Sequence, residues 1–347
     1  MKIYQLRGYA ALACILVAST AQAVEVKVYG KLHVSSDIVD AGHSHGMHAA
    51  MSSNSSNIGF TGSEMLNDWL MALWRLESDI DVTGERGWLL QRNRYIGLAS
   101  VGGTFMAGYQ DTPFRLAAQR FDIYGDTIVD YRTVFGHATN NPQDVNTRYS
   151  IDTRARNSLM YQSPKWGNFQ LRLLQSAGEN KSEDGGDANY ISSTSVTYQL
   201  DKFSLAAAYE LQQQFSSSAV RVVGSVQFGV LRLNGMYETL ESMYTNGKQR
   251  QSFGGNLTLG LPGNFSIHAQ GVGVVNYAGS KLTAALAVFG LSYLPAKSTQ
   301  IYLITSQILN DANSNYMFGA TGHEDQYKLA KLGNDPFAVS LGITHKF

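Results

Sequence analysis

Residues 337–347 read FAVSLGITHKF, and this stretch decides the fold. Apolar side chains alternate with small or polar ones over its whole length, and such a period of two is typical of a β-strand with two unlike faces. Free chain ends usually fray, so an aromatic at the last position indicates that Phe347 belongs to the fold and that its face meets lipid. That face comprises Phe337, Val339, Leu341, Ile343, His345 and Phe347.

The first residues of the chain predict export. Lys2 and Arg7 precede an apolar run over residues 10–18, and Ala21-Gln22-Ala23 has the small-x-small pattern of a signal-peptidase site. The run is too short for a membrane helix, which needs about 18 or more apolar residues. We therefore expect residues 1–23 to be a cleaved signal peptide and residues 24–347 to form one exported domain.

Composition narrows the class of protein. Cys14 is the only cysteine and lies in the expected leader, so the mature chain has no disulfide framework and no thiolate site. Without Lys2 and Arg7, 25 basic residues face 27 acidic ones, a net charge of −2 that does not indicate a nucleic-acid partner. Since no later apolar run could form a membrane helix, a membrane-embedded chain must be a closed β-barrel.

Alternating segments recur along the chain. In residues 70–79, Leu70, Ala72 and Trp74 face one way while Arg75 and Glu77 face the other. Short turns are expected at residues 163–168, 200–203, 228–230, 261–264 and 294–297, and longer polar loops at 40–55, 81–91, 111–155, 177–190, 212–220, 239–251, 274–281 and 310–336. Short turns at one rim and long loops at the other are typical of an outer-membrane barrel. Eight long loops predict an all-β, transmembrane, antiparallel barrel of sixteen strands.

Several blocks of sequence resemble the general Gram-negative porins. They are VKVYGKLHV, SSNIGFTGSE, LMALWRLESD, QRNRYIGLASVGGTFMAGYQDTP, RARNSLMYQSPKWGNFQLRLL, LSYLPAKSTQIYL and the terminal FAVSLGITHKF, and they span the mature chain in the family's order. The resemblance implies a sixteen-stranded barrel, a homotrimer, and a water-filled pore narrowed by a third external loop folded inward. It also implies that the outer-membrane insertion machinery reads Phe347.

The resemblance assigns candidate residues to the narrowest part of the pore. The third loop is the 111–155 stretch, whose expected acidic residues are Asp111, Asp122, Asp126 and Asp130. The opposite wall is expected to be basic. Lys31 matches the first-strand position, Arg92 and Arg154 match family arginines, and Arg75 points inward by alternation.

Two positions depart from the family pattern. Asn57 and Tyr109 stand where arginines are often found. Because the ring of charges sets pore selectivity, we expect a weakly selective pore that leans towards cations, with Asp122 and Asp126 as the carboxylates facing the basic wall.

Histidine residues elsewhere in the chain suggest alternative functions. His43, His45 and His48 have a spacing that could hold a transition metal, but they lie on a Gly/Ser-rich stretch without cysteine, so we expect a surface loop and no metal. His268, with serines nearby on an inward face, leaves open an outer-membrane barrel hydrolase. A secreted β-sandwich adhesin and a substrate-selective barrel channel also stay open.

The favoured interpretation is an outer-membrane porin for passive diffusion of ions and small hydrophilic solutes. It implies no enzymatic activity and no cofactor. The expected partners are two further copies of the chain, membrane lipid and lipopolysaccharide, and the insertion machinery during assembly.

Overall fold

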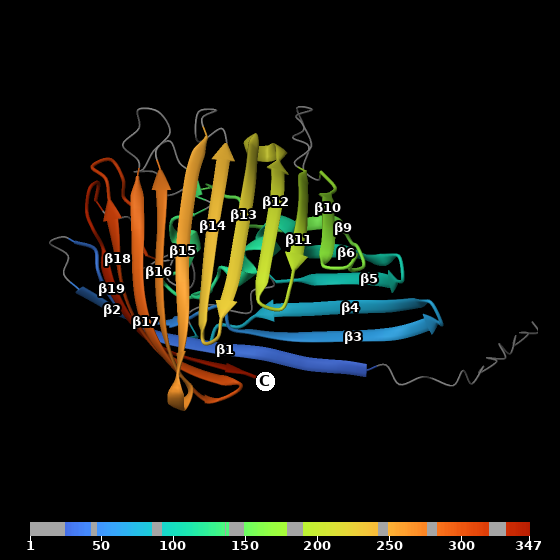
Figure 1. Ribbon diagram of the computed structural model, residues 1–347, viewed down its shortest axis with the longest axis horizontal. Helices are drawn as coiled ribbons and strands as arrows, with labels where there is room; N and C mark the ends of the chain where they lie inside the picture. The colour runs from blue at the N-terminus through green and yellow to red at the C-terminus, as the bar shows by residue number, and fades with distance from the viewer. Residues whose placement is uncertain are drawn as a thin grey trace, which may run out of the picture.

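The computed structural model describes residues 25–42, 47–84, 92–135, 137–138, 149–178, 190–241, 249–275, 283–318 and 331–347. The expected signal peptide lies outside these residues. The described chain is almost entirely β-structure arranged around a lumen (Figure 1). None of the helices in the described ranges is long and apolar enough to cross a membrane.

One antiparallel sheet forms the whole wall. Its order along the wall follows the chain, so each strand pairs with its sequence neighbour. The strands are β1 (Glu25–Asp40), β2 (Met47–Ser53), β3 (Asn57–Asn67), β4 (Leu70–Asp79), β5 (Arg94–Ser100), β6 (Gly103–Asp111), β9 (Arg154–Gln162), β10 (Phe169–Ser176), β11 (Ile191–Gln199), β12 (Phe203–Gln212), β13 (Ser217–Phe228), β14 (Leu231–Glu241), β15 (Arg250–Leu261), β16 (Phe265–Val275), β17 (Ala284–Ala296), β18 (Thr299–Asn310) and β19 (Phe337–Lys346). A separate two-residue pair, β7 (His137–Ala138) and β8 (Tyr149–Ser150), lies within the third loop.

The sheet closes on itself through the first strand. β1 pairs with β19 on one side, where Leu32 lies opposite His345. On its other side β2 covers the upper half of β1 and β3 covers the lower half, with a break at residues 54–56. β2 and β3 therefore act as one strand. The seventeen strand segments of the sheet make a closed barrel of sixteen strands, as the sequence predicts.

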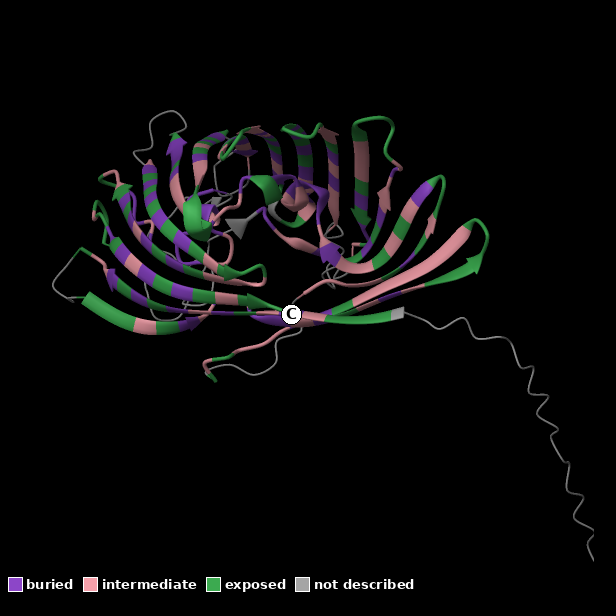
Figure 2. Cartoon of the chain, turned by 60° about the horizontal axis from the view of Figure 1, so that its bottom comes forward, coloured by how far each residue is buried: buried purple, intermediate pink, exposed green. Residues whose placement is uncertain are grey.

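The alternation of the sequence becomes two faces of the wall. Along β12, Phe203, Leu205 and Tyr209 are exposed on the outside, whereas Ser204 and Glu210 are buried towards the lumen. Figure 2 shows this as alternating buried and exposed bands on many strands. A β-strand turns successive side chains to opposite sides, so the apolar ones all reach the lipid-facing surface.

Four of the five predicted short turns lie where the sequence predicts them, at one rim of the barrel, and the fifth shifts to residues 297–298 because β17 continues to Ala296. Some predicted long loops are wrong, because strand pairing extends into them. β2 (Met47–Ser53) occupies most of the predicted 40–55 loop. The predicted 212–220 loop shrinks to residues 213–216, since β12 continues to Gln212 and β13 begins at Ser217. Gln212 and Ser217 at the strand ends are polar and buried on the inner face, and such residues resemble loop residues in sequence.

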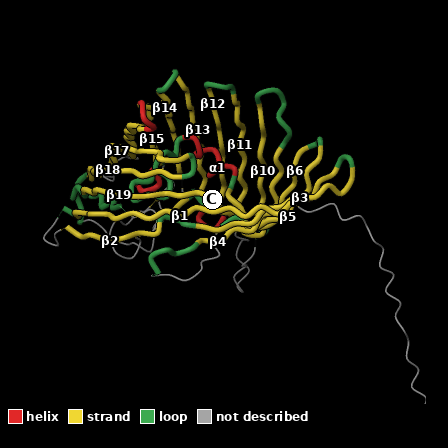
Figure 3. Tube along the Cα trace, turned by 90° about the horizontal axis from the view of Figure 1, so that it is seen from below, coloured by secondary structure: helices red, strands yellow, loops and turns green. Residues whose placement is uncertain are grey.

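The buried core of the protein lies inside the barrel. The loop after β6 folds inward as α1 (Pro113–Ala117) and the 3₁₀ turns η1 (Ala118–Arg120) and η2 (Tyr131–Thr133), and Figure 3 shows these helices within the ring of strands. Its apolar side chains pack on the inner wall. The fully buried members include Phe114, Phe121, Ile128, Phe135, Leu286, Ile304 and Ile308. The inward-folded third loop of the prediction is therefore present.

Candidate functional site

The third loop enters the lumen through a capped helix. Thr112 is the N-cap of α1, its side chain accepts a hydrogen bond from the Arg115 backbone N–H, and Pro113 opens the helix. These residue types favour a helix start because the hydroxyl satisfies a free N–H and proline needs no partner for its nitrogen. The Phe114 N–H then donates to the Ser193 hydroxyl of β11 at 3.0 Å, which turns the helix against the wall.

Polar side chains of the wall hold the irregular backbone of the loop. Asn256 Nδ2 donates to the Phe121 carbonyl oxygen at 2.6 Å, and Gln270 Nε2 donates to that of Val129 at 3.4 Å. Arg250 donates to the Val134 carbonyl. Buried backbone groups outside regular structure need such partners. Amides at inward positions of the strands therefore fix the path of the loop.

The end of the loop is anchored by a buried charge cluster, which we call the root. Arg221 on β13 has no exposed area and donates from both terminal nitrogens to the carboxylate of Asp152, at 2.7 Å each. It also donates to Glu238 on β14, its direct cross-strand neighbour, at 3.0 Å from Nε. Its guanidinium lies 4.0 Å from the centre of the Phe114 ring. Burial tends to raise the pKa of Asp152, but the Arg221 charge outweighs it and holds that pKa below its ordinary value.

The tip of the loop reaches the first strand. Asp126, in a left-handed backbone conformation with φ of 64°, accepts a hydrogen bond from Lys31 Nζ at 2.6 Å. Arg132 lies 3.5 Å from its other oxygen. Burial acts to raise the pKa of Asp126, but Lys31 and then Arg132 outweigh it and hold the pKa well below its ordinary range. The tip of the loop is thus ion-paired to the barrel wall.

The other three predicted basic residues are also ion-paired. Arg75 donates to the Tyr29 hydroxyl at 2.6 Å and lies 3.3 Å from a Glu77 oxygen. Arg92 donates to the Asp79 carboxylate. Arg154 lies 2.9 Å from Asp111, an acidic residue at the end of β6 that also binds Arg115 at 2.8 Å. These three pairs join residues of the wall to one another, and of the four expected basic residues Lys31 is the one whose pair reaches the inward-folded loop.

The remaining two predicted loop carboxylates are turned into the loop. Asp130 has no exposed area and accepts from the Arg132 backbone N–H at 2.8 Å and from Arg132 Nε at 2.9 Å. Burial, and next the negative charge of Asp130, raises the pKa of Asp122 well above its ordinary value. One Asp122 oxygen lacks a hydrogen-bond partner among the described residues. Asp122 is half-buried, with one of its carboxylate oxygens shielded from solvent within the loop.

The two departures from the family pattern end up in different places. Asn57 on β3 lies opposite Lys31 and is buried on the lumen side, as the sequence analysis assumes. Tyr109 on β6 alternates with the exposed Phe105, and its ring lies 5.3 Å from the guanidinium of its cross-strand neighbour Arg94. The alternation of β6 places Tyr109 on the outer side of the wall. Only Asn57 removes a charge from the lumen.

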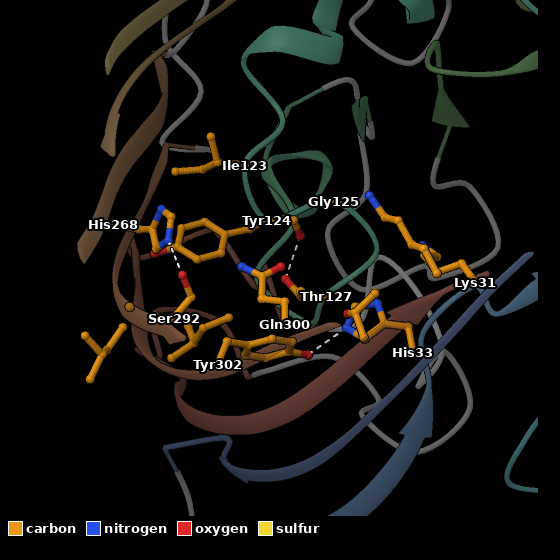
Figure 4. A pocket seen from close by; sticks show the side chains of 15 residues that line it. Lys31, His33, Ile123, Tyr124, Gly125, Thr127, His268, Ser292, Gln300 and Tyr302 are labelled. Atoms are coloured by element: carbon orange, nitrogen blue, oxygen red, sulfur yellow. Dashed lines mark hydrogen bonds between the residues drawn. The ribbon is translucent and has the colours of Figure 1, made fainter. Parts of the chain in front are cut away.

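A cavity of about 160 Å³ lies between the tip of the loop and strands β1 and β16–β19 (Figure 4). In it His268 exchanges hydrogen bonds with the Ser292 hydroxyl at 2.8 Å and with the Thr258 hydroxyl at 3.0 Å. A hydrolase triad would place a carboxylate where Thr258 lies. The pair of His268 and Ser292 therefore lacks the orienting acid among the side chains described around it.

The three clustered histidines of the sequence analysis lie at the start of the chain, around β2. His43 and His45 lie outside the described residues, and His48 is on β2. Within the part of the chain that the structure describes, no group of three or more His, Cys, Asp or Glu side chains could hold a metal ion.

The last residue closes the barrel seam. The backbone N–H and carbonyl of Phe347 exchange hydrogen bonds with Gly30 on β1, at 3.1 and 3.0 Å. The Phe347 ring covers Gly30 so closely that a Cβ atom there would collide with it. This contact makes Phe347 part of the outer surface of the folded barrel.

Sequence reasoning missed the root of the loop. Arg221 is the charged residue of β13, and Glu238 is a charge at a buried inward position of β14. A charge in such a position needs a partner when buried, and this signal was available. Asp152 could not be identified as the partner from the sequence, because it lies in the third loop, 69 residues from Arg221.

Comparisons with known proteins agree with this architecture. The sequence profile of the Gram-negative porin family matches residues 10–313. The chain is 46% identical over 70 residues to the major outer membrane protein P.IA of Neisseria meningitidis serogroup B, and 44% identical to that of serogroup A. Each match covers 19% of this chain and 17% of the relative.

Solved structures show the same fold. An anion-selective porin from Comamonas acidovorans is similar with a TM-score of 0.79 at 18% identity, covering 94% of this chain and 100% of that one. OmpF of Salmonella typhi, in complex with daunomycin, is similar with a TM-score of 0.67 at 16% identity, covering 93% and 97%. Family and fold indicate a channel rather than an enzyme. With its sixteen-stranded barrel, its loop inside the lumen and a family profile matching most of its length, this chain belongs to the Gram-negative porin family of outer-membrane proteins.

Proposed function

We propose that the protein is a diffusion pore of the outer membrane for ions and small hydrophilic solutes, with weak selectivity at its constriction. The pairing of every expected basic residue, namely Lys31, Arg75, Arg92 and Arg154, with a carboxylate carries this proposal. A paired guanidinium or ammonium produces little field beyond a few ångströms, because its partner cancels it. The sequence analysis expects a preference for cations because Asn57 and Tyr109 replace two arginines. Tyr109 lies outside the lumen, so of these two residues Asn57 alone supports that preference.

The assignment of residues to the constriction is part of this proposal. Lys31, Arg75 and Arg92 of the wall, with Asp126 at the tip of the loop, are the groups that a passing ion is expected to meet. Asp111 is proposed to hold Arg154 and Arg115 in place, whereas Asp122 and Asp130 shape the loop from within.

Assembly is proposed to follow the family pattern. Residues 1–23 would direct export, residues 24–347 would form the barrel, and three copies would associate in the membrane with lipid and lipopolysaccharide around them. Phe347 would be read by the insertion machinery before it packs against Gly30. We propose no catalysis at His268, because a hydroxyl and not a carboxylate faces its second ring nitrogen.

Conductance of the purified protein in planar bilayers tests the function. We expect current steps that come in groups of three and a small zero-current potential in a potassium chloride gradient. A large potential of either sign would contradict weak selectivity. Silence over many preparations, with folded trimer present, would contradict a diffusion pore.

A further inference from the structure

A second cavity lies beside the third loop, at the short-turn end of the barrel. It has a volume of about 250 Å³ and is enclosed by α1 and η1, by the turn between β9 and β10, and by the inner faces of β10–β13. It is distinct from the ion-paired constriction, since none of the four predicted wall residues lines it. Its polar and charged lining residues are Gln119, Arg120, Lys165, Asn168, Gln170, Arg172, Thr197, Gln199 and Ser204.

The charges of this cavity are all positive. Arg120, Lys165 and Arg172 line it, and no aspartate or glutamate does. Among the described residues, none of these three side chains forms an ion pair, in contrast to the constriction. Their charges therefore remain uncompensated, and a pocket lined by one sign of charge attracts ions of the other sign.

The neutral side chains of the cavity favour the same kind of ligand. Arg172 Nε donates to the Gln162 amide oxygen at 2.8 Å, and its Nη2 donates to that of Gln170 at 3.0 Å. These contacts hold the guanidinium plane in place and add no negative charge. The other lining amides and hydroxyls can each donate one or more hydrogen bonds. A guanidinium held in this way and neighbouring amide donors suit the oxygens of phosphate or carboxylate groups.

We propose that this cavity binds small oxyanions of the phosphate or carboxylate class as they cross the barrel. The proposal rests on the proposed pore function and adds a substrate class to it. A solute leaving the narrow, charge-paired constriction towards the short-turn end meets this cluster of uncompensated charges. The site would raise the local concentration of oxyanions without a positive ring at the constriction itself.

Inhibition of chloride current by inorganic phosphate tests the proposal. The full-length trimer is placed in a planar bilayer in potassium chloride, and potassium phosphate is added at constant potassium concentration. We expect phosphate to lower the current in the unchanged protein. Replacing two of the cations, as Arg120→Gln with Arg172→Gln, should raise the phosphate concentration for half-inhibition about tenfold, because two charge-assisted hydrogen-bond donors are lost.

Matched variants separate this site from general surface charge. Arg232→Gln removes a cation at the same end of the barrel, where Arg232 bonds Gln227 at 2.8 Å outside the cavity, and it should leave the inhibition unchanged. Arg120→Gln alone changes an exposed loop residue and should give part of the effect in a barrel that folds normally. Equal inhibition of the double variant and the unchanged protein would overturn the proposal, as would an equal effect of Arg232→Gln.

Calorimetric titration of the detergent-solubilised trimer with phosphate measures binding to the same site and does not depend on channel current. Binding that weakens about tenfold in the double variant supports the site even if the bilayer shows no channels, in which case only the pore function fails. Normal channels in plain potassium chloride, together with no phosphate binding in the titration, would overturn the site and leave the pore function intact.

Discussion

The third loop is fastened to the barrel at two places that differ in burial. At the root, Arg221, Asp152 and Glu238 are almost completely shielded from solvent, with side-chain exposures of 0, 0 and 1%. At the tip, Lys31 and Asp126 keep exposures of 17 and 24%. Both are ion pairs between a loop and a wall, but water screens only one of them.

The difference in burial gives the two ion-paired sites different roles, since the root stabilises the fold and the tip affects the pore. A buried charge that loses its partner is left in a low dielectric, so removal of one member of the root is expected to unfold the loop region. A part-exposed pair keeps some contact with water, so a charge that loses its partner there is still partly solvated. The root is therefore suited to hold the loop in the lumen. The tip is suited to tune the pore at small cost to the fold.

The largest effect is expected from breaking the root. Arg221→Met removes the cation that two buried carboxylates share and should destabilise the barrel by about 3 to 5 kcal/mol. Urea unfolding of the refolded protein in lipid vesicles measures this change. Arg232→Met on the adjacent β14, where the arginine bonds only a glutamine among the described residues, is the matched control and should be near neutral. If Arg221→Met and Arg232→Met were equally stable, the buried root would contribute no more to stability than a surface arginine does. The proposed difference between root and tip would then be wrong.

A change in the wall alone is expected to have the next largest effect. Leu171 faces outward on β10 and Arg172 faces the lumen. Leu171→Arg should cost about 2 to 4 kcal/mol near mid-membrane, while Arg172→Leu should be nearly neutral for folding. Yields of heat-modifiable trimer rank the two variants. The reverse ranking would show that the outward assignment of β10 is wrong. The effect of Arg221→Met could then no longer be compared with that of a lipid-facing substitution.

The pH dependence of stability is expected to differ between Asp122 and Asp126. The pKa of Asp126 is lowered by its cations, so its stabilisation is present above the ordinary aspartate pKa and is lost as pH falls through and below that value. The pKa of Asp122 is raised, so the folded protein retains a proton that the unfolded chain releases, and stability declines as pH rises from the ordinary value towards the raised one.

Two amide variants test this contrast by unfolding midpoints between pH about 3 and about 8. Asp126→Asn should lower the midpoint at neutral pH, and its effect should become smaller as the pH falls below the ordinary aspartate pKa. Asp122→Asn should raise it at neutral pH, since an amide needs no proton. Identical pH profiles for the two variants would contradict the different positions of the carboxylates.

The smallest effect on stability, and the clearest on function, is expected at the tip. Lys31→Met removes the pair with Asp126, whose other oxygen still lies 3.5 Å from Arg132, and should cost less stability than Arg221→Met. It leaves a negative charge at the constriction and should shift the zero-current potential in a salt gradient towards cations, whereas Asp126→Asn should shift it towards anions. If neither variant moves the potential while conductance stays normal, the tip does not line the constriction.

The sequence by itself predicted the wall of this protein. Alternation in FAVSLGITHKF and in residues 70–79 is a local property of the chain, and a strand turns it directly into an outer and an inner face. The closure of β19 on β1, with Phe347 over Gly30, follows from the same pattern, because only a closed barrel satisfies every strand edge in lipid. Loop ends were less certain, since polar lumen-facing residues of β2 resemble loop residues.

Only the tertiary structure decided which charges meet. Lys31 and Asp126 are 95 residues apart, and their pairing depends on how far the loop reaches across the lumen. The same holds for Arg221 with Asp152, and for the three cations that share the lower cavity. A charge in sequence has a sign but no partner, and the field that an ion experiences depends on the partner as much as on the sign. The inward face of each strand was therefore readable from the alternation of the sequence, but the electrostatic balance on that face was not.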